Sequence, residues 1–326
     1  MRAGSLRRKV PDAACRGPIC REVGHSAVHY NIDRKKFENI RFTPEADQLE
    51  TPSFTAEEMI ELSHAGKLNQ PGHFSITELN DVMISDIRRM WDLFIANKSD
   101  WYRKALFFQA AVIDAENPLR VSIDRRAVPE SKVNVGYLRQ MESLGLIGGI
   151  SFADDTVSFA FKNPIVMTAL RDPGAALELF TFMSLKLRKQ WFSDCEINLR
   201  VDWDGPGPSR TCNELDVVAV CGVNALFISC KSGKLETDHL NEIYTLTSRL
   251  GGPLAKPVLM TAALFPGRDN RAFLERGKDM GIEEIALNEI CPRIARNEYK
   301  GIETCRRCSQ RACERKLAER LHDLCK

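Results

Sequence analysis

The stretch Asn213-Glu-Leu-Asp-Val-Val-Ala-Val-Cys-Gly-Val-Asn-Ala-Leu-Phe-Ile-Ser-Cys-Lys231 decides the fold, because it predicts two strands joined by a tight turn. Runs of β-branched and apolar residues cover 214–220 and 225–231. The segment 221–224 between them contains a glycine and an asparagine, which favour turns. We therefore expect an antiparallel hairpin at this point of the chain.

The first strand of this hairpin carries two acids. Side chains alternate along a strand, so we expect Glu214 and Asp216 on one face and Leu215 and Val217 on the other. By the same rule, the run 196–203 before it should place its apolar side chains on a single face.

The second strand should carry Ser229 and Lys231 on one face, with Cys230 directed into the core. A carboxylate and an ammonium on a common face can hold a divalent cation and a water beside a phosphodiester. The simpler interpretation, a solvated ion pair of Asp216 with Lys231 at a sheet edge, stays open at this point.

An apolar helix is predicted upstream, over 174–187, and its composition indicates burial on nearly all sides. Glu178 is the only acid in it. Burying an unpaired carboxylate is costly, so Glu178 should be paired, face a solvated cleft or coordinate a cation.

Strands and helices alternate after the hairpin, which predicts an α/β fold with a mixed sheet flanked by helices. The expected elements are a helix, a strand, a second helix and a short apolar run over 238–250, 257–263, 270–280 and 285–287.

These segments resemble a known family. Glu178 on a helix, Asn213-Glu-Leu-Asp216, Phe227-Ile-Ser-Cys-Lys-Ser-Gly233 and Leu250-Gly-Gly252 resemble the PD-(D/E)XK nucleases, and more narrowly the nuclease domain of CARF-linked CRISPR ancillary effectors. The resemblance covers roughly residues 130 to 292. It implies a restriction-endonuclease-like α/β fold and a nuclease that cyclic oligoadenylate activates in antiviral defence.

The resemblance also assigns roles to residues. It implies Mg²⁺ or Mn²⁺ held by Glu178, Asp216 and the main-chain carbonyl of Cys230, with Lys231 as the catalytic lysine. Nucleic acid, DNA or RNA or both, is the implied substrate, and a homodimer is the implied assembly.

Two further residues of the motif have supporting roles. Glu214 is expected beside the metal ligands or facing the substrate. Ser229 stands where the superfamily commonly has an acid, so the site has one formal ligand charge fewer. That departure supports an alternative in which the chain is a catalytically inactive, nucleic-acid-binding or interacting remnant of such a nuclease.

The sequence before the nuclease predicts a winged-helix-like segment, with a helix over 134–144 and strands over 150–152 and 156–161. Its helix carries Arg139 as the only cation, which favours packing over groove reading and makes a transcriptional regulator the third interpretation. The predicted divisions are a disordered start, a helical linker or sensor remnant, the winged-helix-like module, the nuclease and a basic tail, over 1–25, 26–115, 116–172, 173–292 and 293–326.

The sequence does not predict a sensor domain ahead of the nuclease, because no glycine-rich turn follows an apolar strand in the first 130 residues. A bound cyclic oligoadenylate is therefore expected only if a sensor survives. The chain has 326 residues, a net charge of +2 and 11 cysteines. This composition predicts a cytoplasmic protein with reduced thiols and no membrane partner.

The tail 293–326 has ten Lys or Arg against five Asp or Glu. Such a run can contact phosphates or be a solvated face. Four cysteines in it, Cys305, Cys308, Cys313 and Cys325, invite a zinc site. The apolar spacing predicts instead one amphipathic helix, which cannot wrap four ligands around a metal.

Overall fold

A computed structural model gives the fold of the protein, and two compact units divide the chain, Met1–Pro52 and Ser53–Lys326. The structure describes residues 28–31, 36–39, 53–68, 76, 78–113, 115–124, 126–128, 131, 133–203, 212–262, 271–290 and 310–325. The first unit contributes an antiparallel pair, β1 (Val28–Asn31) with β2 (Lys36–Asn39). The predictions for 1–25, for Cys305 and for Cys308 lie outside these residues.

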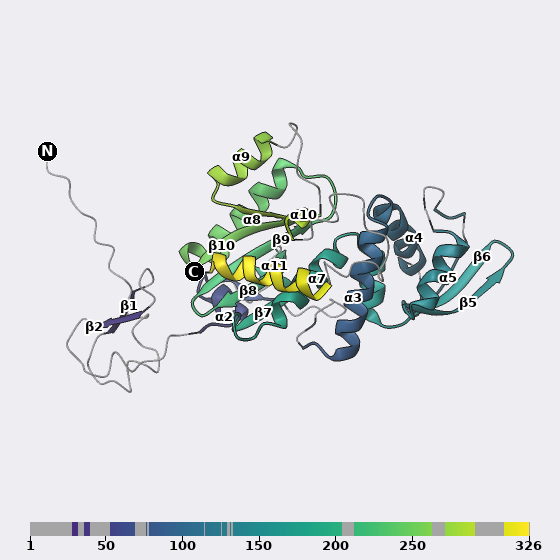
Figure 1. The fold of residues 1–326 in the computed structure, drawn as a ribbon, viewed down its shortest axis with the longest axis horizontal. Coiled ribbons are helices and arrows are strands. Elements are labelled where there is room, and N and C mark those ends of the chain that lie inside the picture. Colours follow the sequence, from purple (N-terminus) through teal and green to yellow (C-terminus); the bar gives the residue numbers. More distant parts are fainter. Residues whose placement is uncertain are drawn as a thin grey trace. The chain divides into compact units, whose positions relative to one another are not determined.

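A mixed sheet in the order β11-β10-β9-β8-β7-β3 is the centre of the second unit (Figure 1). Its strands, in chain order, are β3 (Gly66–Lys67), β7 (Asp194–Asp202), β8 (Cys212–Cys221), β9 (Asn224–Lys231), β10 (Ala255–Thr261) and β11 (Glu283–Ala286). The strands β9, β10 and β11 run parallel, and the pairs β3–β7, β7–β8 and β8–β9 are antiparallel. The sheet confirms the predicted fold class.

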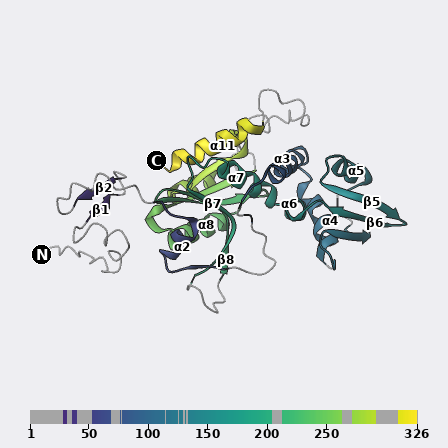
Figure 2. The ribbon, with the colours of Figure 1, turned by 90° about the horizontal axis from the view of Figure 1, so that it is seen from below.

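Helices cover both faces of this sheet (Figure 2). One face packs on α7 (Ala175–Lys186) and, beyond it, on α11 (Gln310–Leu324). The other face packs on α2 (Ala56–Glu61) and α8 (Thr237–Leu250). Parallel strands require crossovers, and these are α8 between β9 and β10 and α9 (Arg271–Asp279) between β10 and β11. The short segments η3 (Gly252–Leu254) and α10 (Leu287–Ile290) complete this part.

The buried helix predicted over 174–187 is α7, and it is apolar all round as expected. Each residue from Ala175 to Leu185 is buried except Glu178. Because both the sheet and the neighbouring helices contact α7, it contributes to the core on every side.

Side chains on β7 and β8 do not keep the simple alternation that the sequence predicts. Ile197 and Val217 lie in the core on the α7 side of the sheet. Their neighbours two residues away, Leu199 and Leu215, lie in the core on the α8 side. The expectation that Leu215 shares a face with Val217, and Ile197 with Leu199, is therefore wrong.

The change of face occurs at the residues between these pairs. Asn198 has φ of 53°, in the left-handed region that asparagine tolerates better than most residues. Asp216 lies directly across from it on β8, in a register that omits both residues from the ladder. A local reorientation of both strands at this point brings the Asp216 carboxylate to the end of the β8–β9 pairing.

A helical and three-stranded portion precedes the sheet, in the order α3 (Asp81–Ala96), α4 (Trp101–Ile113), β4 (Arg120–Asp124), α5 (Val135–Ser143), β5 (Ile147–Ala153), β6 (Thr156–Phe161) and α6 (Pro164–Arg171). Its strands pair as β4-β6-β5, and β5 and β6 form the strand pair that the sequence predicts over 150–152 and 156–161. On α5, the Arg139 guanidinium forms an ion pair with the Glu142 carboxylate at 2.7 Å, so its positive charge is balanced within the helix.

The helix α3 begins at Asp81, because the Asn80 side chain accepts a hydrogen bond from the Met83 N–H and caps it. In the part of the chain that the structure describes, no helix is both long and apolar enough to cross a membrane.

Candidate active site

The candidate site forms where β8 and β9 separate. Their ladder runs from Cys221 opposite Asn224 to Val217 opposite Ile228 and stops before Asp216. The next free amide on β9 belongs to Cys230, and its N–H donates to Asp216 Oδ2 at 2.7 Å. A side-chain oxygen of β8 thus takes the place of a main-chain acceptor, and this fixes the carboxylate at the sheet edge.

Two further groups of β9 contact the same carboxylate oxygen. The Ser229 hydroxyl donates to Asp216 Oδ2 at 3.3 Å, and the Lys231 Nζ lies 3.8 Å from it. All three contacts use Oδ2, so Oδ1 has no hydrogen-bond partner among the described residues. The structure thus brings together Asp216, Ser229 and Lys231, and it leaves one carboxylate oxygen open.

The electrostatics of Asp216 reflect opposing influences. Burial raises the pKa of Asp216, and the negative charge of Glu242 adds to this rise. The Lys231 ammonium, the Cys230 N–H and the Ser229 hydroxyl lower the pKa of the same carboxyl. Burial is the largest influence, which means that the anion lacks compensating charge in its pocket.

Glu178 is the second acid of the cluster. It lies in the first turn of α7, is partly buried and makes no hydrogen bond to any residue that the structure describes. Burial raises its pKa well above the usual value, and the charge of Asp216 is the next largest cause, followed by Asp172 and Glu214. The Lys231 ammonium lowers the pKa of Glu178 but does not offset burial and the neighbouring negative charges.

The start of α7 depends on a glycine. A Cβ at Gly174 would lie 2.7 Å from Glu178 Oε1, closer than carbon and oxygen can approach. The main-chain N–H of Gly174 donates a hydrogen bond to Asp172 Oδ1 at 2.8 Å. The absence of a side chain at this position therefore allows Glu178 to fold back along the first turn.

Glu214 lies at the exposed rim of the site and pairs with Arg200 of the adjacent strand β7 at 3.2 Å. A small cavity is lined by Glu214, Asp216 and Lys231, and also by Glu242 of α8. Glu242 was not singled out from the sequence, because an exposed acid on an amphipathic helix is common. The only signal for it is that α8 directly follows the strand bearing Lys231.

The Cys230 side chain lies in the core, as expected. Its thiol is 3% exposed and contacts Thr181 Oγ1 of α7 at 3.9 Å. Burial raises the pKa of the Cys230 thiol well above its ordinary value, so it is neutral. The role of its main-chain carbonyl as a metal ligand stays a prediction.

The acids present fit a hard divalent cation. Among the described residues, no three His, Cys, Asp or Glu side chains are close enough to form a complete metal site. Magnesium retains several waters and often binds through one or two carboxylates, so the open Asp216 Oδ1 and the unpartnered Glu178 carboxylate suit it. A bound cation would also favour the ionised form of both carboxyls, whose pKa values burial raises.

The cysteines of the tail do not form a metal site in the described part. Cys313 and Cys325 are buried at 3% and 4% exposure. They lie twelve positions apart on and just beyond α11, which separates them by about 18 Å along the helix axis. They cannot share a metal ion, which agrees with the amphipathic helix that the spacing predicts.

Comparison with known proteins identifies the same part of the chain. Residues 170–297 match the family model described as the Card1-like endonuclease domain, which confirms the resemblance to the CARF-linked nucleases over this range. Glu178, Asp216 and Lys231 all lie within the matched residues. No curated protein sequence matches the chain.

Two solved structures are similar to the protein. Protein VC1899 from Vibrio cholerae has a TM-score of 0.60 at 15% identity, and the match covers 92% of this chain and 68% of that one. Can2 from Sulfobacillus thermosulfidooxidans, in complex with cyclic tetra-adenylate, has a TM-score of 0.49 at 13% identity, with coverage of 84% and 68%. The likeness to VC1899 shows a shared fold.

Proposed function

We propose that this protein hydrolyses phosphodiester bonds in DNA, RNA or both, with Mg²⁺ or Mn²⁺ held by Asp216 and Glu178. One observation carries the proposal: a fixed carboxylate with an open oxygen contacts a lysine, and its charge raises the pKa of a second, unpartnered carboxylate, Glu178. This cluster lies within residues that match an endonuclease domain.

Each residue has a defined task in the proposed reaction. The Cys230 N–H and the Ser229 hydroxyl orient Asp216, and Asp216 and Glu178 bind the cation through their free oxygens. When bound there, the metal lowers the pKa of its water and stabilises charge on the phosphate. Lys231 positions the attacking water and neutralises the charge that develops in the transition state.

The resemblance extends the proposal to the setting. We propose that the activity serves CRISPR-linked antiviral defence, in a homodimer, with cyclic oligoadenylate as an activator where a sensor domain is present. The favoured alternative is a nuclease fold without activity that binds nucleic acid, because Ser229 supplies no charge where the superfamily commonly has an acid.

The test is cleavage of plasmid DNA and labelled single-stranded RNA with Mn²⁺, with EDTA, and with and without cyclic oligoadenylate. We expect Asp216→Asn to reduce the rate by about 10³-fold or more, since the amide cannot supply ligand charge. The matched control is Asp279→Asn, the same change at an exposed position of α9 outside the site. Cleavage that survives EDTA or Asp216→Asn contradicts the proposal, and folded protein that cuts nothing favours the alternative.

A further inference from the structure

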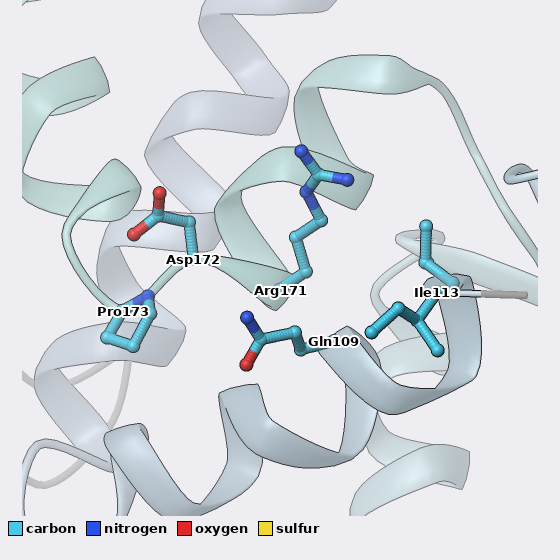
Figure 3. Close-up of a pocket in the computed structure, with 6 residues that line it drawn as sticks. Gln109, Ile113, Arg171, Asp172 and Pro173 are labelled. Atoms are coloured by element: carbon cyan, nitrogen blue, oxygen red, sulfur yellow. The ribbon is translucent and has the colours of Figure 1, made fainter. Parts of the chain in front are cut away.

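A second cavity, of about 480 Å³, is shown in Figure 3. Its walls come from α4 and from the connection between α6 and α7, and the lining residues are Gln109, Val112, Ile113, Arg171, Asp172 and Pro173. A volume of this size suits a small organic molecule or one unit of a polymer.

The lining offers a cation, an amide and an aliphatic wall. Arg171 is exposed and makes no ion pair with any described residue, and its side chain diverges from that of Asp172 in Figure 3. Gln109 projects from α4 toward the α6–α7 connection and is also exposed. Ile113 is 74% exposed, which is unusual for so large an apolar side chain.

The edge of this cavity borders the acidic cluster. Asp172 lines the cavity and accepts the Gly174 N–H. A Cβ built at Gly174 would lie 3.4 Å from Asp172 Oδ1 and 2.7 Å from Glu178 Oε1, so the two carboxylates flank this glycine. A polymer whose scissile phosphate lies at Glu178 and Asp216 therefore has its neighbouring unit at the cavity.

We propose that the cavity holds the nucleotide adjacent to the scissile phosphodiester, an inference that rests on the proposed nuclease function. Arg171 binds the phosphate of this nucleotide through its planar guanidinium, which can donate two parallel N–H bonds to phosphate oxygens. The base lies against Val112, Ile113 and Pro173, and the Gln109 amide hydrogen-bonds its polar edge. Arg171 and Gln109 are thus positioning residues for the substrate.

One consequence concerns the form of the substrate. A base can enter a pocket only after it leaves the stack of its neighbours, which costs more free energy in a duplex than in a single strand. Strands with an unpaired nucleotide at this position should accordingly bind better than the same sequence in a duplex.

The first experiment measures cleavage kinetics of labelled single-stranded DNA and RNA by the full chain. We expect Arg171→Gln to raise KM about tenfold with kcat within about twofold, and to reduce the slope of log affinity against log salt by about one. The matched control is Arg103→Gln, the same change at an exposed position of α4 that does not line the cavity. An effect with either strand supports the proposal, and equal behaviour of the two variants overturns it.

The second experiment measures binding without cleavage, by fluorescence anisotropy with Asp216→Asn as background. Gln109→Ala should weaken binding of an intact single strand about threefold to tenfold, and have no effect on a strand with an abasic site at the flanking nucleotide. A loss that is the same on both strands overturns base recognition, as does a duplex that binds as tightly as the single strand.

The two experiments separate the two proposals. If the wild-type chain binds the strands but never cuts them, the nuclease function fails while the binding measurement still reports on the cavity. If Asp216→Asn abolishes cleavage but Arg171→Gln and Gln109→Ala behave as wild type, the nuclease stands and the cavity assignment fails.

Discussion

At the scale of single residues, the site depends on how Asp216 is held. Its Oδ2 accepts the Cys230 N–H at 2.7 Å in place of a main-chain carbonyl, so the carboxylate is part of the sheet's own hydrogen bonding. Fixing the carboxylate in this way costs little conformational entropy, because β8 and β9 are already paired up to Val217 and Ile228. Preorganisation of this kind keeps a ligand in place before a cation or a substrate arrives.

Ser229→Glu tests whether the site binds a metal. Ser229 is 8% exposed and its hydroxyl contacts Asp216, so a glutamate here adds a like charge beside that carboxylate. We expect a lower thermal midpoint in EDTA, because the charges repel, and about tenfold tighter Mn²⁺ binding by calorimetry, because a third carboxylate faces the cation.

The matched control for this change is Ser229→Gln, which has nearly the same size and no charge. It should share the steric part of the destabilisation and show no gain in Mn²⁺ affinity. If the glutamate variant binds Mn²⁺ no better than the glutamine variant, the assignment of this cluster as a metal site is wrong.

At the scale of helices and strands, α11 is attached to α3 by a buried ion pair. Arg88 Nε and Nη2 each donate to a Glu314 carboxylate oxygen at 2.8 Å, and the Glu314 side chain is 2% exposed. The bidentate geometry compensates for the removal of the carboxylate from water. The tail helix is therefore an integral part of the core of the second unit.

Arg88→Met should lower the free energy of unfolding by about 3 kcal/mol, because the buried Glu314 carboxylate then has no cation. Urea denaturation measures this loss. The double variant Arg88→Met with Glu314→Gln removes the stranded charge and should recover part of it. A double variant no more stable than the single one would show that lost packing, and not an uncompensated charge, causes the effect.

A carboxyl on β11 gives this element a pH dependence. Glu284 Oε1 is buried without a hydrogen-bond partner among the described residues, and Gly277 of α9 has no room for a Cβ against it. Burial, followed by the charge of Glu289, raises the pKa of Glu284 to about 7. The folded protein therefore holds a proton that the unfolded chain releases at lower pH.

Glu284→Gln should remove the decrease in the free energy of unfolding that Glu284 causes as the pH rises. The native state binds more protons than the unfolded state between the ordinary pKa of a glutamate and about 7. The contribution of Glu284 to the free energy of unfolding therefore falls across this window. Thermal midpoints at pH 4.5 and pH 7.5 measure the difference, with Glu283→Gln as the control. An unchanged pH dependence in Glu284→Gln contradicts this assignment.

At the scale of the whole second unit, one hydrophobic core joins the helical and three-stranded portion to the mixed sheet. This core includes residues of α3, α4, β6, α6, α7, β9 and α11. At its centre, the Trp91 ring of α3 stacks on the Phe180 ring of α7, with centroids 3.8 Å apart and planes 8° apart. Continuous burial across both portions predicts that they unfold together.

Trp91→Ala tests this continuity. Trp91 is 3% exposed, so truncation should cost about 3–5 kcal/mol through lost burial and a void. Far-ultraviolet dichroism and the fluorescence of the remaining tryptophans should then follow one shifted urea transition. The control is Tyr102→Ala, at 63% exposure, with an effect within about 0.5 kcal/mol. Two separate transitions in the variant would show that the portions fold independently.

Much of the local structure could be predicted from the sequence. The hairpin of β8 and β9, the buried α7 and the crossover helices α8 and α9 follow from patterns that neighbouring residues create, and their bounds agree within two residues. The candidate residues Glu178, Asp216 and Lys231 could also be named, because an acid in an apolar helix and a lysine at a strand end are visible without tertiary contacts.

The sequence by itself determined the elements, the mixed α/β class and the identity of the candidate acids and lysine. Only the tertiary structure decided that the faces reverse at Asn198 and Asp216, that Glu242 and Asp172 influence the two acids, and that Asp172 lines a second cavity. The physical reason is range. Periodicity and turn chemistry act between residues close in the chain, whereas these features arise from packing between elements far apart in it.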